Sequence, residues 1–349
     1  MHTTSRTSTR ATAQPSWQQS LAQYQTPDLL RSLWQVANTF TPFFGLLYVM
    51  YLSLAYPYWL TLALALPTAG LLVRIFIILH DCGHGSFFKS MRANNILGSV
   101  CGFLLFVPYH QWRFAHAIHH ATSSDLDRRG TGDIITLTVP EYLDRSWWGR
   151  LTYRIYRHPL FLLCLAPMLL LLIGQRFVNP TSRKRERCAV YCTNVALLTL
   201  IVSMSLTIGL KAYVLIYMPV LLMAGTALVY GFYVQHQFEG SYWQRHEAWD
   251  YVTAALQGSS YFKLPRVLQW FTGNIGLHHV HHLSSRIPNY ALQRCHDENL
   301  FLHQATTITL GTSLKSLSLK LWDEEQGRFI SFGDLKTLRK QRALAADGT

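Results

Sequence analysis

Histidines are concentrated in three clusters of this chain. The first lies in HDCGH, the second in HAIHH and the third in HHVHH. In chain order they contain His80 and His84, then His116, His119 and His120, then His278, His281 and His282. Residues at i, i+3 and i+4 share one face of a helix, so each cluster presents its imidazoles on a single side. Neutral imidazole is the commonest metal ligand in proteins and suits iron, zinc and copper. The spacing therefore predicts metal binding.

The number of histidines indicates more than one ion. Eight imidazoles exceed the about four to six ligands that one ion takes, whereas eight or nine suit two ions with positions open to oxygen. His279 lies one residue off the ligand stripe, and we do not expect it to bind. No carboxylate stands at the ligand spacing of the clusters, so nitrogen should supply nearly all ligands. Nearby acids, each of which could also be a solvated or structural charge, could orient the imidazoles: Asp81, Asp125, Asp127, Asp133, Glu239 and Asp250.

Composition favours a membrane protein. Only 14% of the residues are charged and the mean hydropathy is +0.12, whereas soluble domains carry about a quarter charged residues. The 13% aromatic content excludes disorder. A net charge of +13 suits nucleic acid or a membrane surface, and the apolar runs favour the membrane, with no nucleic-acid partner. The six cysteines form no CxxC pair, which indicates packing residues rather than disulfides.

The apolar runs predict an all-α integral membrane protein with a cytosolic cap that holds the metal site. Four runs are long enough to cross about 30 Å of hydrocarbon, at about residues 36–56, 59–79, 188–210 and 212–235. Two shorter runs, 96–109 and 159–173, should not cross, because a crossing at 159–173 would place the basic stretch 183–187 outside. We expect a flexible cytosolic tail over 1–30, a membrane domain over 31–310 and a cytosolic tail over 311–349.

Two stretches near the third cluster carry a resemblance to a known family. They are QHQFEGSYW (Gln235–Trp243) and ALQGSSYFKLPRVLQWFTGNIGLHHVHHLSSRIPNY (Ala255–Tyr290). With the three histidine boxes, they resemble the integral-membrane fatty acid desaturases and hydroxylases, and most of all the bacterial acyl-lipid desaturases.

The resemblance implies a site of two non-haem iron ions. Family members use these ions, dioxygen and two electrons to place a cis double bond in an acyl chain. The resemblance adds His236 as a ninth ligand, and its place at the end of a span, level with the boxes, agrees. In the acyl-CoA branch, an asparagine four residues before that histidine holds an iron-bound water. Here this position is Phe232, and Asn274 is a weaker candidate.

The predicted function is desaturation of acyl chains of membrane lipids, with no catalytic side chain beyond the metal ligands and no other cofactor-binding residues. The chain lacks a GxGxxG nucleotide motif, so an external carrier such as ferredoxin or flavodoxin must supply the electrons. We expect a bacterial cytoplasmic membrane, with the site and both termini on the cytoplasmic side. A lipid hydroxylase with the same irons is the nearest alternative. A haem- or metal-binding membrane protein without enzymatic activity fits less well, because these histidines cluster at span ends.

Overall fold

Four long helices dominate the computed structural model, which describes residues 16–338. They are α2 (Leu29–Ser53), α3 (Trp59–His84), α9 (Lys184–Thr207) and α10 (Leu210–His236). Each is long and apolar enough to cross a membrane. The predicted all-α membrane fold is therefore confirmed. The helix bounds differ from the predicted runs: α2 and α9 begin and end earlier than predicted, whereas α3 and α10 continue past the predicted ends. In α3 the extension carries His80 and His84 on the final turns.

The outer faces of these helices require lipid. Leu30 and Trp34 of α2 are 79% and 69% exposed, and Leu206 of α9 is 81% exposed. Such continuous apolar exposure is unfavourable in water. In contrast, α3 lies in the centre and packs against α2, α4 (Met91–Leu104) and α10. The helix that carries the first histidine box is thus held on several sides.

Between α3 and α9 in the chain lie seven shorter helical elements. These elements are α4, α5 (Tyr109–Thr122), α6 (Val139–Leu143), α7 (Trp147–Tyr156), a π-helical turn (Phe161–Leu165), α8 (Ala166–Leu172) and a 3₁₀ turn (Gly174–Arg176). The chain bends by 64° between α7 and the segment that follows it. Pro167 has no backbone N–H to donate to the Leu163 carbonyl four residues earlier. The hydroxyl of Thr226 on α10 donates to this carbonyl instead, at 2.6 Å. That the segments 96–109 and 159–173 do not cross the membrane stays a prediction.

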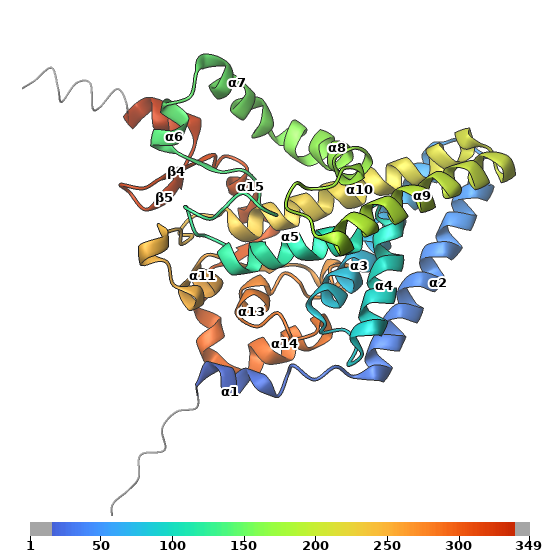
Figure 1. Ribbon diagram of the computed structural model, residues 1–349, viewed down its shortest axis with the longest axis horizontal. Helices are drawn as coiled ribbons and strands as arrows, with labels where there is room; N and C mark the ends of the chain where they lie inside the picture. The colour runs from blue at the N-terminus through green and yellow to red at the C-terminus, as the bar shows by residue number, and fades with distance from the viewer. Residues whose placement is uncertain (1–15, 339–349) are drawn as a thin grey trace, which may run out of the picture.

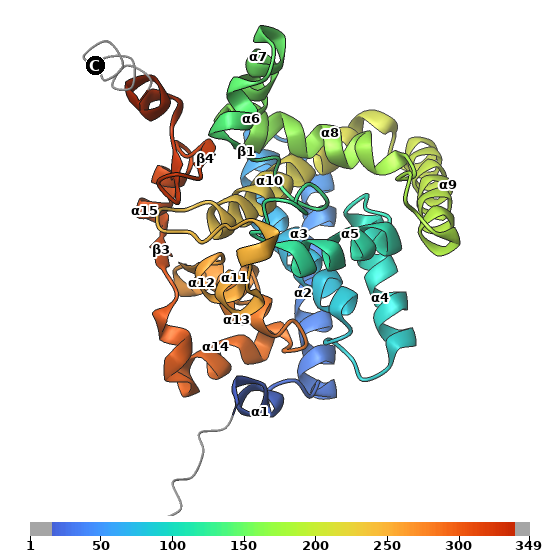
Figure 2. The same cartoon turned by 60° about the vertical axis from the view of Figure 1, so that its left-hand side comes forward.

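The C-terminal part folds into a cap beside the end of α3. Figures 1 and 2 show it on one side, in orange and red, with the far ends of α9 and α10 extending away. Its helices are α11 (Tyr251–Gln257), α12 (Arg266–Phe271), α13 (His278–Leu283), α14 (Asn289–Glu298) and α15 (Leu310–Ser316), with 3₁₀ turns at His246–Ala248 and Leu300–Gln304.

One of two small sheets joins the C-terminal part to the rest of the chain, and the other lies within the C-terminal part. The five strands are β1 (Leu137–Thr138), β2 (Tyr261–Lys263), β3 (Thr307–Thr309), β4 (Leu321–Asp323) and β5 (Arg328–Ile330). In the first sheet β4 pairs parallel with β1 and antiparallel with β5, and in the second β2 pairs parallel with β3. The first sheet thus ties the C-terminal hairpin to the segment that follows α5.

Residues 16–30 are structured, so the flexibility expected over 1–30 is wrong for this part, and the tail predicted over 311–349 also contains structured residues. Residues 16–30 contain α1 (Trp17–Ala22), which opens with a capping box at Ser16, and Leu21 is fully buried against the cap. Residues 311–338 contain the β4–β5 hairpin, in which Leu321 and Ile330 are fully buried. Apolar burial orders both segments. The expectation for residues 1–15 and 339–349 lies outside the described residues.

Candidate metal centre

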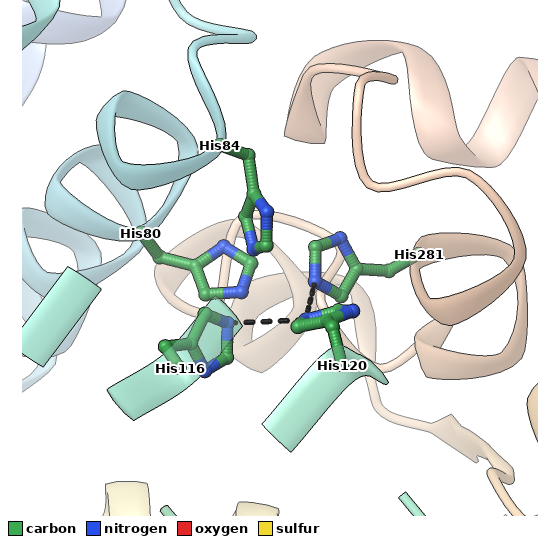
Figure 3. A group of neighbouring side chains, drawn as sticks. All are labelled: His80, His84, His116, His120 and His281. Carbon is green, nitrogen blue, oxygen red and sulfur yellow. Dashed lines mark hydrogen bonds between the residues drawn. The ribbon is translucent and has the colours of Figure 1, made fainter. Parts of the chain in front are cut away.

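The histidine boxes converge at the meeting point of four helices. His80 and His84 lie on the last two turns of α3, and the second box lies on the C-terminal half of α5. His236 is the last residue of α10, and the third box makes up most of α13. Clusters that lie nearly 200 residues apart in the chain thus face a common centre, as Figure 3 shows for five of the rings.

The nine predicted histidines divide into two groups. The first contains His80, His84, His116, His120 and His281, and the second contains His119, His236, His278 and His282. Within each group, one nitrogen from every ring lies within 4.8 Å of all the others. The groups adjoin, because the rings of His120 and His282 stack with centroids 4.2 Å apart. Such an arrangement offers two neighbouring sites, each surrounded by nitrogen donors.

The nitrogen geometry fits metal ions. In the second group, the Nε2 atom of His236 lies 3.2 Å from that of His119 and 2.9 Å from that of His278. In the first group, the Nε2 atoms of His80 and His84 are buried without a hydrogen-bond partner in the described chain. Two imidazole nitrogens that bind one ion at about 2.1 Å and at right angles lie about 3.0 Å apart. The contacts and orphaned nitrogens are therefore compatible with metal binding in both groups.

The rings are held neutral, as metal ligands must be. Burial lowers the pKa well below its ordinary value for five rings outside the membrane-spanning helices, and the neighbouring imidazoles lower it further. These rings are His116, His120, His278, His281 and His282. At neutral pH each ring therefore keeps a lone pair available for a metal ion.

One carboxylate orients a histidine in each group. Asp81 Oδ1 lies 3.3 Å from Nδ1 of His80, in the first group. Asp133 Oδ1 accepts a hydrogen bond from Nδ1 of His119, in the second group. A proton on Nδ1 leaves Nε2 as the donor to the metal, so each carboxylate fixes both the tautomer and the ring direction. Sequence reasoning named both acids but could not separate them from the four others.

The remaining candidate acids serve the surrounding structure. Asp125 pairs with Arg128 at 2.6 Å, and Asp127 pairs with Arg245 at 2.7 Å. The side chain of Asp250 caps α11 by accepting from the backbone of Thr253, and Glu239 is exposed. None of these four carboxylates forms a hydrogen bond or an ion pair with the nine histidines in the described chain.

Aromatic rings close the centre on two sides. Trp112 stacks on His116 with centroids 4.6 Å apart. Its ring also approaches Gly83, where a Cβ atom would lie 2.9 Å from the indole, so the glycine of HDCGH makes room for this contact. On the other side, the centroid of the Phe232 ring lies 5.0 Å from the centroid of the His119 ring. Phe232 thus puts hydrocarbon where a polar side chain could have held a water molecule.

Two residues near the third box do not join either group. The Nε2 atom of His279 lies 3.3 Å from Nδ1 of His296, away from the other histidines. Asn274 precedes α13 in a left-handed conformation and donates to the Asn289 carbonyl at 3.0 Å. Asn274, the weaker candidate to hold a water molecule, lies four residues before His278 but does not share its helical face, because α13 begins only at His278.

Comparisons with known proteins match most of this chain. The family model described as fatty acid desaturase matches residues 56–305. A fatty acid desaturase of Bacillus subtilis (strain 168) is 50% identical over 316 residues, which cover 90% of each chain. The sn-1 oleoyl-lipid 12-desaturase of Synechocystis is 28% identical over 84% of each chain. The sn-1 acyl-lipid omega-3 desaturase (ferredoxin) of the same organism is 28% identical over 63% of this chain and 62% of its own. The chain belongs to the fatty acid desaturase family.

Proposed function

We propose that this protein inserts a cis double bond into the acyl chains of membrane lipids. The observation that carries the proposal is the division of nine histidines into two adjoining groups of five and four. Two relatives are named as desaturases that act on acyl lipids, and one name specifies ferredoxin. We therefore propose lipid-bound acyl chains as the substrate and a ferredoxin- or flavodoxin-type protein as the electron donor.

The nine histidines would hold two iron ions, because a nearly all-nitrogen set of neutral imidazoles suits iron. When bound, the iron pair would supply the oxidation, in which dioxygen takes one hydrogen from each of two adjacent methylenes, together with two electrons from the carrier and two protons, and is released as two waters. The protein holds the ligands in place through Asp81 and Asp133 and excludes water with Trp112 and Phe232. The Lys- and Arg-rich segments favour a bacterial cytoplasmic membrane, with the centre on the cytoplasmic side.

Expression in a host that lacks desaturases tests this function. We expect new unsaturated fatty acids in the lipid fraction, with their double bonds located by mass spectrometry, and about two irons per purified chain. His116→Ala should abolish the product while the protein still inserts. A hydroxylated product would favour the hydroxylase of the same superfamily. One zinc or one haem per chain would contradict the di-iron site.

A further inference from the structure

A buried arginine of α3 lacks a counter-charge from the protein. Arg74 is only 7% exposed, and no carboxylate of residues 16–338 forms an ion pair with it. Its Nε donates to the Thr39 hydroxyl of α2 at 3.1 Å, its Nη1 donates to the Trp270 carbonyl of α12, and its guanidinium lies 4.2 Å from the centre of the Trp270 ring. A charged side chain within a membrane helix is costly unless it is paired. The Trp270 carbonyl satisfies one terminal nitrogen of Arg74, but the charge is balanced by no carboxylate of residues 16–338 and Nη2 forms no hydrogen bond there, so this nitrogen is free to bind an anion.

A polar cavity of about 480 Å³ adjoins Arg74. Its lining includes Arg74, Arg266, Gln269, Asn289, Tyr290 and Gln293, and no carboxylate. Arg266 is exposed and also makes no ion pair in the described chain. The side-chain amides of Gln269, Asn289 and Gln293 already donate to other residues. The two guanidinium groups are therefore the donors that match the oxygens of a phosphate, which arginine binds with charge-assisted hydrogen bonds.

The place of the cavity along α3 fits the depth at which a membrane holds its phosphates. Arg74 precedes His80 by six residues, so it lies about 9 Å further along α3 toward the membrane interior. The adjacent helix α12 exposes Val267 and Leu268, and with Trp270 it has the apolar and aromatic character of an interfacial segment. A lipid headgroup reaches this boundary with its acyl chains already in the hydrocarbon.

The cavity also shares a wall with the metal centre. Asn289 lines the cavity and donates two hydrogen bonds to Oδ2 of Asp81, at 2.7 Å from its backbone N–H and 2.8 Å from its side chain. The other oxygen of Asp81 lies beside His80. Figure 2 shows the segment of α12 to α14 beside the end of α3. A group bound in the cavity would thus be linked to His80, a predicted metal ligand, through Asn289 and Asp81.

We propose that this cavity binds the phosphate of a glycerophospholipid and so positions the lipid substrate by its headgroup. That the lipid is the substrate rests on the proposed function, whereas the phosphate site does not. The same phosphate chemistry occurs in soluble acyl carriers, such as acyl-coenzyme A. We favour the lipid because the cavity lies at the membrane boundary and because a lipid phosphate there can pair with the buried Arg74.

Native mass spectrometry of the full-length, delipidated protein tests the site without turnover. The probes are phosphatidylglycerol and a diacylglycerol with the same acyl chains but no phosphate. We expect Arg266→Gln and Arg74→Gln to weaken phosphatidylglycerol binding at least about tenfold and to leave diacylglycerol binding unchanged. Arg294→Gln is the matched control, because Arg294 lies next to Gln293 on α14 but pairs with Glu298 outside the cavity.

Two results would overturn the proposal. One is unchanged phosphatidylglycerol binding in Arg266→Gln, which changes an exposed side chain and so remains informative if Arg74→Gln fails to fold. The other is full displacement of phosphatidylglycerol by coenzyme A, which would assign the cavity to a soluble carrier. Because binding is measured without iron or product, a failure of the proposed desaturation would leave this result intact.

Discussion

The carboxylate of Asp133 accepts a hydrogen bond from Nδ1 of His119, although the two residues are separated by a loop. The loop includes Gly130 and Gly132, both with positive φ, and a Cβ atom on Gly132 would lie 2.9 Å from the Ala115 carbonyl of α5. The chain therefore turns back tightly against α5. This turn places Asp133 beside Nδ1 of His119, while Nε2 of His119 faces His236 of the second group.

Removal of this carboxylate should weaken metal binding. We expect Asp133→Ala to lower the iron affinity about 10–100-fold, because His119 loses the partner that fixes its tautomer and direction. Iron content after dialysis against increasing chelator measures the effect. Asp144→Ala, which removes an exposed acid, serves as the control. Equal iron retention in the two variants would show that Asp133 does not support the metal ligand.

The third histidine box allows a test within a single helix. His281 belongs to the first group and His282 to the second, while His279 faces His296 instead. We expect His281→Ala and His282→Ala each to lower iron content and to reduce desaturation more than about 100-fold, beyond the usual effect of an outer-shell change. His279→Ala should keep iron and product. Full activity in either ligand variant would contradict the assignment.

How the histidines divide shows where sequence reasoning reaches its limit. Their spacing within a helix is local, so all nine could be selected from the sequence and from family resemblance. The division into groups was not accessible, because adjacent residues separate: His119 and His120 belong to different groups. That separation depends on how α5 and α13 pack against α3 and α10. The contact between Asp133 and His119 depends on the same packing.

The ends of the fold were less predictable than its membrane helices. Runs of about 20 apolar residues are a strong signal for a span, and four helices match them. The strands β4 and β5 have three residues each, which is too short for an alternating pattern to stand out. Helix α1 is also short, and its burial depends on contacts with the distant cap.

Membrane orientation provides a third test. The stretch 183–187 at the start of α9 is rich in Lys and Arg, and such stretches remain on the cytoplasmic side. A reporter fused after Arg187 should therefore read cytoplasmic, and one fused at Gly209, between α9 and α10, should read external. A periplasmic signal after Arg187 would refute the four-span topology and would place the bent α7–α8 segment across the membrane.

The last prediction concerns a buried lysine beneath the C-terminal hairpin. The Nζ atom of Lys320 donates to the Arg157 carbonyl at 2.6 Å. Burial, together with the charge of Arg157, lowers the pKa of Lys320 from 10.5 to about 8. Between these two values the unfolded chain binds a proton that the folded chain has released. The free energy of unfolding should therefore rise with pH across this window and should not gain from this group below it.

Substitution of this lysine should remove the pH dependence. We expect Lys320→Met to show a smaller rise in Tm than the parent protein between about pH 8 and 10. Lys315→Met, which removes an exposed lysine of α15, should keep the parent slope. Thermal unfolding in detergent at a series of pH values makes the comparison. If Lys320→Met keeps the full slope, the rise originates in other groups and the Lys320 side chain does not lose its proton in this range.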